Sequence, residues 1–153
     1  MKPPFVPSRR SFGRDITKRP GSGDLAKKVY VCSGCGLWHV QPKKPAQCMA
    51  CGRMDFITFA SKDEATRFAQ LDLLRKLGKI KNLRMQTRYD LLAYGPEGQP
   101  VKVAVYTDDF NYDRDGVLVI EDVKPHGIDR FAAVKLQWMA AMGRVVTIVK
   151  VQR

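Results

Sequence analysis

The four cysteines form two C-x-x-C pairs, each followed by glycine, with 12 residues between Cys35 and Cys48. A two-residue gap lets both sulfurs of a pair face one point, and two pairs supply the closed tetrahedral S₄ site of structural zinc, with Zn–S bonds of ~2.3 Å. Disulfides and redox-active pairs are the alternatives, and the glycine turns and an intracellular setting argue against them. We expect Cys32, Cys35, Cys48 and Cys51 to bind structural Zn²⁺ in a zinc ribbon, which leaves His39 as a surface residue.

A second group of residues combines carboxylates with a lysine. The segment 117–124 begins as a continuous apolar run, typical of a central strand, and its last four residues are two acids, a valine and a lysine. Because side chains alternate along a strand, Asp122 and Lys124 share one face and Glu121 points to the other. Asp109 follows the preceding predicted strand. Two such carboxylates with a lysine beside them suit Mg²⁺ or Mn²⁺ and phosphoryl chemistry, and the alternative is a surface ion pair.

Asp109, followed after 12 residues by Asp122-Val123-Lys124, resembles the signature of the PD-(D/E)XK nuclease superfamily. Within it, residues 59–142 resemble a family of small phage and prophage proteins. The matching segments are 59–65, 71–80, Gln86, 106–110, 121–124 and Lys135. These relatives resemble Holliday-junction resolvases and the endonuclease subunits of transposons. The resemblance covers about the last 95 residues and reaches neither the ribbon nor the residues before it.

The resemblance implies a restriction-endonuclease-like fold and a role for each matching residue. Asp109 and Asp122 would hold the catalytic Mg²⁺ or Mn²⁺, with Glu64 and the Val123 carbonyl as further ligands. Lys124 would position the attacking water or stabilise developing charge. The reaction implied is hydrolysis of a DNA phosphodiester that leaves a 5′-phosphate.

Two of these assignments have competing explanations. Ser61 and Glu64 form a capping box, in which Glu64 would reach back to the Ser61 N–H at the start of a helix. Lys135 lies beside an apolar stripe and faces either solvent or the site. The sequence departs from the family pattern at Pro125-His126, where the relatives are expected to have glycine, and this alters the loop beside the site.

Hydrophobic periodicity and turn residues predict a mixed α/β domain at 60–153, preceded by a zinc ribbon at 29–59. The predicted ribbon strands are 29–31, 37–40 and 55–59. In the larger domain the predicted elements are helix 62–77, strands 87–93, 101–107 and 117–124, helix 131–142 and strand 145–151. Their order, α-β-β-β-α-β, predicts a small mixed sheet flanked by helices.

The formal net charge of +12 points to a polyanionic partner, for which nucleic acid is the commonest candidate. Residues 1–28 contain eight basic and two acidic residues and no periodic pattern, which is typical of a flexible basic arm. A solubilising tail is the alternative for this arm, and dimerisation is the alternative for the ribbon. The candidate DNA contacts are Arg9, Arg10, Arg14, Lys27, Lys28, Lys43, Lys44, Arg53 and Lys135, with Trp38 as a stacking surface.

Together these features predict a metal-dependent DNA endonuclease, acting as a homodimer on branched DNA such as a Holliday junction. The alternatives are a nuclease for duplex DNA, of the transposon-end or nicking type, and a non-catalytic zinc-dependent nucleic-acid binder. No apolar run approaches the roughly 20 residues that span a bilayer, and the basic first 20 residues lack the apolar core of a secretory signal. We therefore expect a protein of the bacterial or phage-infected cytoplasm, with no membrane partner.

Overall fold

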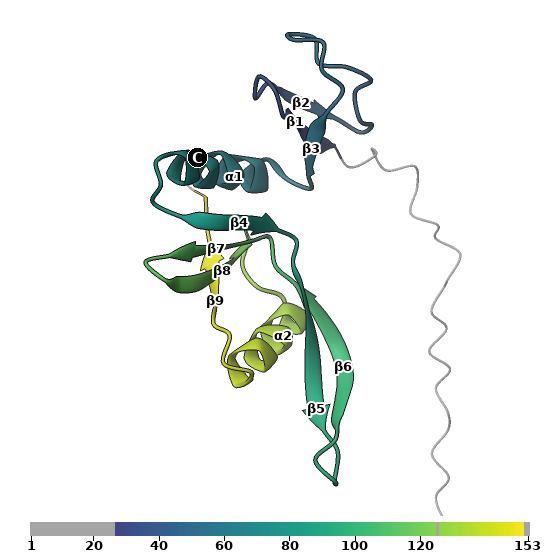
Figure 1. Cartoon of the computed structure of the whole chain (residues 1–153). Coiled ribbons are helices and arrows are strands. Elements are labelled where there is room, and N and C mark those ends of the chain that lie inside the picture. The colour runs from purple at the N-terminus through teal and green to yellow at the C-terminus, as the bar shows by residue number, and fades with distance from the viewer. Residues whose placement is uncertain (1–26, 125, 152–153) are drawn as a thin grey trace, which may run out of the picture.

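The computed structural model describes residues 27–124 and 126–151, which contain two helices and nine strands (Figure 1). In chain order these are β1 (Lys28–Cys32), β2 (Trp38–Gln41), β3 (Phe56–Phe59), α1 (Lys62–Lys76), β4 (Lys81–Met85), β5 (Arg88–Tyr94), β6 (Pro100–Thr107), β7 (Phe110–Arg114), β8 (Val117–Val123), α2 (Arg130–Ala141) and β9 (Val146–Val149). Neither helix is long and apolar enough to span a bilayer. The candidate DNA contacts Arg9, Arg10 and Arg14 lie outside the described residues.

The strands form three sheets. The ribbon has the order β2-β1-β3, the main sheet has the order β4-β7-β8-β9, and β5 and β6 pair only with each other. In the main sheet β8 and β9 run parallel, with α2 between them in sequence, and the other neighbours are antiparallel. The predicted mixed α/β class is confirmed, and both helices begin and end within one residue of their predicted bounds.

The composition of the main sheet corrects the predicted strand order. β4 and β7 belong to it although no hydrophobic pattern predicts them, whereas predicted strands 87–93 and 101–107 form the separate hairpin β5–β6. β4 is an edge strand with mostly exposed residues, so its sequence shows no alternation. β7 buries Asn111, whose amide donates to Thr87 Oγ1 at 2.6 Å and to Asp108 Oδ2 at 2.7 Å. Because of these polar and exposed residues, neither strand has the apolar periodicity by which strands are predicted.

One hydrophobic core joins the ribbon to the main sheet. Val29, Val31 and Phe59 of the ribbon belong to the same buried cluster as Ala65 and Leu71 of α1. The cluster continues into β7 and β8. The predicted boundary at the end of the ribbon therefore falls inside a shared core, and the ribbon packs against α1 (Figure 1).

A buried ion pair fastens α1 to β8. The Glu121 side chain is 4% exposed and accepts hydrogen bonds from Arg67 Nε at 2.8 Å and Arg67 Nη2 at 2.7 Å. The Tyr112 hydroxyl donates to the same carboxylate at 2.6 Å. Burial alone would raise the pKa of Glu121, but these donors hold the pKa below its ordinary value. The charged form of Glu121 is therefore the stable one, and it holds helix and sheet together.

The substitution Glu121→Gln should lower the free energy of unfolding by about 2 kcal/mol at neutral pH, because it leaves buried donors poorly matched. Since folding lowers the pKa of Glu121, its stabilisation is complete above about pH 4.5 and is lost as the pH falls through the folded pKa. The difference between the variant and the wild type should therefore shrink in acid. Urea unfolding at neutral pH and near pH 3 measures both effects.

A matched control is Asp72→Asn on the same helix. Asp72 pairs with Arg75 at 2.6 Å and Lys76 at 2.7 Å, and both cations are largely exposed. Surface pairs of this kind contribute about 1 kcal/mol or less. Equal losses in the two variants would contradict the role of the buried pair.

Candidate metal centres

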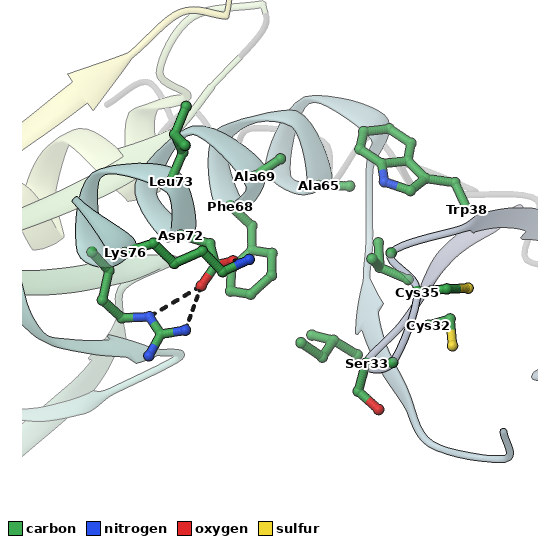
Figure 2. A pocket seen from close by; sticks show the side chains of 15 residues that line it. Cys32, Ser33, Cys35, Trp38, Ala65, Phe68, Ala69, Asp72, Leu73 and Lys76 are labelled. Atoms are coloured by element: carbon green, nitrogen blue, oxygen red, sulfur yellow. Dashed lines mark hydrogen bonds and ion pairs between the residues drawn. The ribbon is translucent and has the colours of Figure 1, made fainter. Parts of the chain in front are cut away.

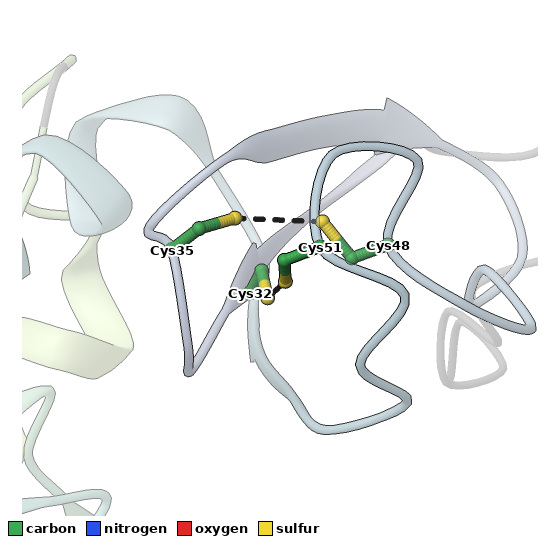
Figure 3. A group of neighbouring side chains, drawn as sticks. All are labelled: Cys32, Cys35, Cys48 and Cys51. Atoms are coloured by element: carbon green, nitrogen blue, oxygen red, sulfur yellow. Dashed lines mark hydrogen bonds between the residues drawn. The ribbon is translucent and has the colours of Figure 1, made fainter.

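The four cysteine thiols converge at one end of the ribbon (Figure 3). All four Sγ atoms lie within 4.8 Å of one another, and the Cys32–Cys51 and Cys35–Cys48 pairs are each 3.5 Å apart. None of these four residues forms a disulfide. The edges of a ZnS₄ tetrahedron with ~2.3 Å bonds measure about 3.8 Å, so both the donors and their spacing suit zinc. The clustering predicted from the spacing of the cysteines is confirmed.

Two similar turns bring each pair of thiols together. The Gly36 N–H donates to the Cys32 carbonyl at 2.9 Å, and the Gly52 N–H donates to the Cys48 carbonyl at 2.8 Å. Gly36 has a φ of 76° and Gly52 a φ of 71°, in the left-handed region where a side chain would introduce strain. The glycine after each pair is therefore part of the turn that aims the thiols.

His39 lies inside the ribbon, so its interpretation as a surface residue is wrong. Its side chain is 7% exposed, and its ring meets Phe56 edge-on with the centroids 5.3 Å apart. Its interaction with Cys48 is the largest of several hydrogen bonds that together lower the pKa of that thiol to about 5, against the effect of burial. Because a thiolate is the form that binds a metal, His39 favours the charge state that the thiol cluster needs.

Asp109 and Asp122 lie next to each other beside the end of β8. Asp109 stands in the two-residue link between β6 and β7, and its N–H donates to the Glu121 carbonyl at 3.2 Å. Its Oδ2 accepts the Val123 N–H at 2.7 Å. Asp122 Oδ1 pairs with Lys124 Nζ at 2.9 Å. The neighbouring strand that brings Asp109 to this position is β7, which replaces the predicted strand 101–107.

The electrostatics of this group favour a bound cation. Burial, the adjoining Asp122 carboxylate and the charge of Glu64 raise the pKa of Asp109 to about 7, against the opposing bond from the Val123 N–H. Burial lowers the pKa of Lys124, but the three carboxylates outweigh it and the net shift is upward. Two crowded carboxylates repel each other when both are ionised. A hard divalent cation with oxygen ligands, such as Mg²⁺ or Mn²⁺, would remove that repulsion.

Glu64 caps α1 and also lines a cavity beside the two carboxylates. Its N–H donates to Ser61 Oγ at 3.1 Å, and its Oε2 accepts the Ala60 N–H at 3.1 Å. The predicted capping box is therefore present, with the Ala60 N–H in place of the Ser61 N–H. The same side chain, together with Asp109 and Gln86, lines a cavity of about 210 Å³. Glu64 therefore both caps the helix and lies at the candidate cation site.

Asp108, next to Asp109 in sequence, has a structural role. It is buried and accepts hydrogen bonds from the Thr87 N–H at 2.7 Å, the Tyr89 hydroxyl at 3.0 Å and the Asn111 amide at 2.7 Å. These bonds join the start of β5 to the start of β7. They therefore hold the link in which Asp109 stands.

Tyr106 is a residue of this site that the sequence analysis does not single out. Its side chain is buried, and its hydroxyl has no hydrogen-bond partner among the described residues. Burial raises the pKa of Tyr106, and the charge of Asp122 raises it further. A buried donor without a partner calls for a physical explanation. Its sequence signal is its place at the start of the matching segment 106–110, three residues before Asp109.

The predicted DNA contacts of the ribbon are at its surface. Those within the described residues are exposed: Lys27, Lys28, Lys43, Lys44 and Arg53. The Lys44 ammonium lies 5.9 Å from the centroid of the Phe56 ring. Arg53 lies across Gly34, where an added Cβ would come within 2.4 Å of its Cδ. Lys135 is half-buried on α2.

A larger cavity of about 510 Å³ lies between the ribbon and α1 (Figure 2). Trp38 lines it from the ribbon and Phe68 from the helix. At its far end Asp72 pairs with Arg75 and Lys76, which partly neutralises the charge of those cations. Trp38 therefore faces an aromatic, weakly charged cavity.

Residues 51–145, more than half of the chain, match the family described as protein of unknown function (DUF1064). The chain belongs to the DUF1064 family. No curated protein and no solved structure matches it. The DUF1064 region contains Glu64, Asp109, Asp122 and Lys124, but only Cys51 of the four cysteines. The carboxylate group thus lies wholly within the family region, and the thiol cluster mostly precedes it.

The thiol cluster predicts that this DUF1064 protein is purified with one zinc ion per chain. Cys48→Ser should lose most of that zinc, because three thiolates hold the ion less tightly than four. Elemental analysis of the purified proteins measures the loss. Ser33→Ala is the matched control, since the Ser33 hydroxyl lies in the first turn and donates to the Asp55 carbonyl at 3.1 Å, outside the thiol cluster. A wild-type protein that is folded and free of zinc would contradict the assignment.

Proposed function

We propose that this DUF1064 protein is a divalent-cation-dependent DNA endonuclease with a structural zinc ribbon. The observation that supports it best is the convergence of Glu64, Asp109, Asp122 and Lys124 from three separate parts of the chain. A surface ion pair would leave its acid in solvent, whereas the Asp122 side chain is 5% exposed. The burial and crowding of these carboxylates favour a cation site over a surface pair.

In this proposal Asp109 and Asp122 hold the cation, with Glu64 and the Val123 carbonyl as further oxygen donors. When bound, the cation would polarise the scissile phosphate and lower the pKa of the attacking water. The Val123 N–H holds Asp109 Oδ2 at 2.7 Å, which leaves Oδ1 as the oxygen with lone pairs for a cation. Burial keeps bulk water away from the carboxylates and strengthens their interaction with a cation.

Lys124 acts in this proposal as a fixed positive charge and hydrogen-bond donor. The neighbouring carboxylates raise its pKa, so its ammonium stays protonated at neutral pH and cannot accept a proton. An ammonium at this position can orient a water molecule or stabilise the negative charge that develops on the phosphate. Its side chain is 35% exposed, so it reaches both Asp122 and the solvent-facing side of the site.

The order of elements around the main sheet also supports the proposal. Without the hairpin β5–β6, the chain runs α1, β4, β7, β8, α2 and β9. This is the helix-strand-strand-strand-helix-strand order that the resemblance to PD-(D/E)XK nucleases implies. The candidate cation site lies beside the paired strands β7 and β8 of this sheet.

We propose branched DNA as the substrate, cut by a homodimer with one active site in each subunit. The net charge of +12 favours a polyanion, and the choice of DNA rests on the resemblance. α2 exposes Phe131 and Val134, at 83% and 48%, which contact with a second copy would bury. Two active sites would account for paired cuts across a symmetric junction.

The decisive experiment incubates the zinc-loaded protein with a labelled four-way junction, a matched duplex and a single strand, in Mg²⁺ or in EDTA. We expect symmetric junction cleavage in Mg²⁺ alone. Asp122→Asn should bind the junction normally and cut it at least about 100-fold more slowly, because it removes a cation ligand. Asp90→Asn is the matched control, since Asp90 pairs with Lys102 on the exposed hairpin.

The other outcomes separate the alternatives. Cleavage of the duplex or the single strand in place of the junction would support the nuclease activity and contradict branched DNA as the substrate. Binding of nucleic acid by the wild type without any cleavage would contradict the enzyme and favour a non-catalytic zinc-dependent binder.

The cation site should also show a defined pH dependence. Below the Asp109 pKa of about 7, a proton must leave before the carboxylate binds a cation. The apparent affinity for Mn²⁺ should therefore rise by up to about tenfold per pH unit below that value and level off above it. Titration calorimetry between about pH 6 and pH 8 measures the slope, and Asp109→Asn should bind weakly without it. A flat wild-type affinity would contradict the assignment of Asp109.

A further inference from the structure

Tyr106 differs from Tyr112 and Tyr89 in the bonding of its hydroxyl. Its side chain is 4% exposed, yet its hydroxyl has no hydrogen-bond partner among the described residues. The Tyr112 hydroxyl donates to Glu121 at 2.6 Å, and the Tyr89 hydroxyl donates to Asp108 at 3.0 Å. A buried donor without a partner destabilises a protein and calls for a physical explanation.

The surroundings of Tyr106 are apolar around the ring and acidic around the hydroxyl. The ring belongs to a buried cluster with Leu91, Ile120 and Met139. The groups that act on the hydroxyl are carboxylates. Asp122 is the strongest, through its charge and through a side-chain interaction that falls short of hydrogen-bond geometry, and Asp109 and Asp108 follow. Burial and these charges keep the hydroxyl protonated at neutral pH, so it can only donate to them.

Of these carboxylates, Asp108 has no room for a further donor, and Asp122 is the one that acts most strongly on the Tyr106 hydroxyl. Asp108 already accepts three hydrogen bonds, and Asp109 accepts the Val123 N–H. Asp122 Oδ1 has Lys124 at 2.9 Å. Each carboxylate oxygen has two lone pairs, so Asp122 can accept a further donor and still ligate a cation.

We propose that Tyr106 is a positioning residue for the candidate cation site, whose hydroxyl donates to the Asp122 carboxylate when a divalent cation is bound. This inference rests on the proposed function, since it needs a cation at Asp109 and Asp122. A cation between Asp109 and Asp122 would take the place of the contact between these two carboxylates and leave an Asp122 lone pair for a further donor. The Tyr106 hydroxyl then gains the partner that it otherwise lacks, and donors of this kind fix the orientation of a ligating carboxylate.

The test is the substitution Tyr106→Phe, with Tyr112→Phe as the matched control. Both remove one oxygen from a buried ring, but only the Tyr112 hydroxyl already has a partner. Without added Mn²⁺ or Mg²⁺, zinc-loaded Tyr106→Phe should unfold at the wild-type temperature or above it, and Tyr112→Phe should unfold below it. In Mn²⁺ titrations, Tyr106→Phe should bind about tenfold to 100-fold more weakly, as for lost partners of metal ligands, while Tyr112→Phe should match the wild type.

Thermal unfolding without added divalent cation and calorimetric titration with Mn²⁺ supply these readouts without a cleavage assay. Wild-type Mn²⁺ affinity in Tyr106→Phe would overturn the inference and leave the proposed function in place. Destabilisation of Tyr106→Phe without added cation as large as that of Tyr112→Phe would also overturn it, because the hydroxyl would then have a partner without the cation. If the wild type binds Mn²⁺ no better than Asp122→Asn does, the proposed cation site fails, and this inference fails with it.

Discussion

The alternation of side chains at the end of β8 places two sets of charges on opposite faces of one strand. Glu121 faces α1, where Arg67 holds it in a buried ion pair. Asp122 faces the other way, toward Lys124. A slip of one residue in the pairing of β7 with β8 would exchange these faces and bury Asp122 against the helix. The register in which Phe110 lies opposite Glu121 therefore determines both the attachment of the helix and the geometry of the candidate cation site.

The same ion pair orients the start of α1. Arg67 and Glu64 are three residues apart, so they lie on one side of the helix, and the bond from Arg67 to Glu121 directs that side toward the sheet. Glu64 consequently lines the cavity that Asp109 lines. Its capping bonds, including the one from the Ser61 hydroxyl at 3.1 Å, use one lone pair on each oxygen and leave others for a ligand. The cap therefore preorganises Glu64 for the site.

The sequence could predict those features of the fold that are determined by residues close to one another in the chain. These are the two helices, the glycine turns between the cysteines, and the alternation at the end of β8. The pairing of strands depends on distant residues, and segments 87–93 and 101–107, with their marked apolar content and tight turn, pair only with each other. Buried polar residues do not recur at a regular interval in the sequence. The burial of Asn111, His39 and Tyr106 can therefore be recognised only in the folded structure. The spacing of the carboxylates predicted the candidate site, whereas the place of Glu64 in it came from the family resemblance.

The ribbon contributes to the candidate cation site as a support for α1. Val31 and Phe59 pack in the same core as Ala65, the residue after Glu64, and Ile57 lines both the cavity beside the ribbon and the cavity beside the carboxylates. Thiolates and carboxylates select different cations, so the two centres can be filled independently. The two centres are nevertheless joined through the protein, because strands β1 and β3 of the ribbon share a hydrophobic core with α1. The ribbon that contains the thiol cluster therefore supports the part of α1 that lines the candidate cation site. A separate appendage that only bound nucleic acid would not have this structural role.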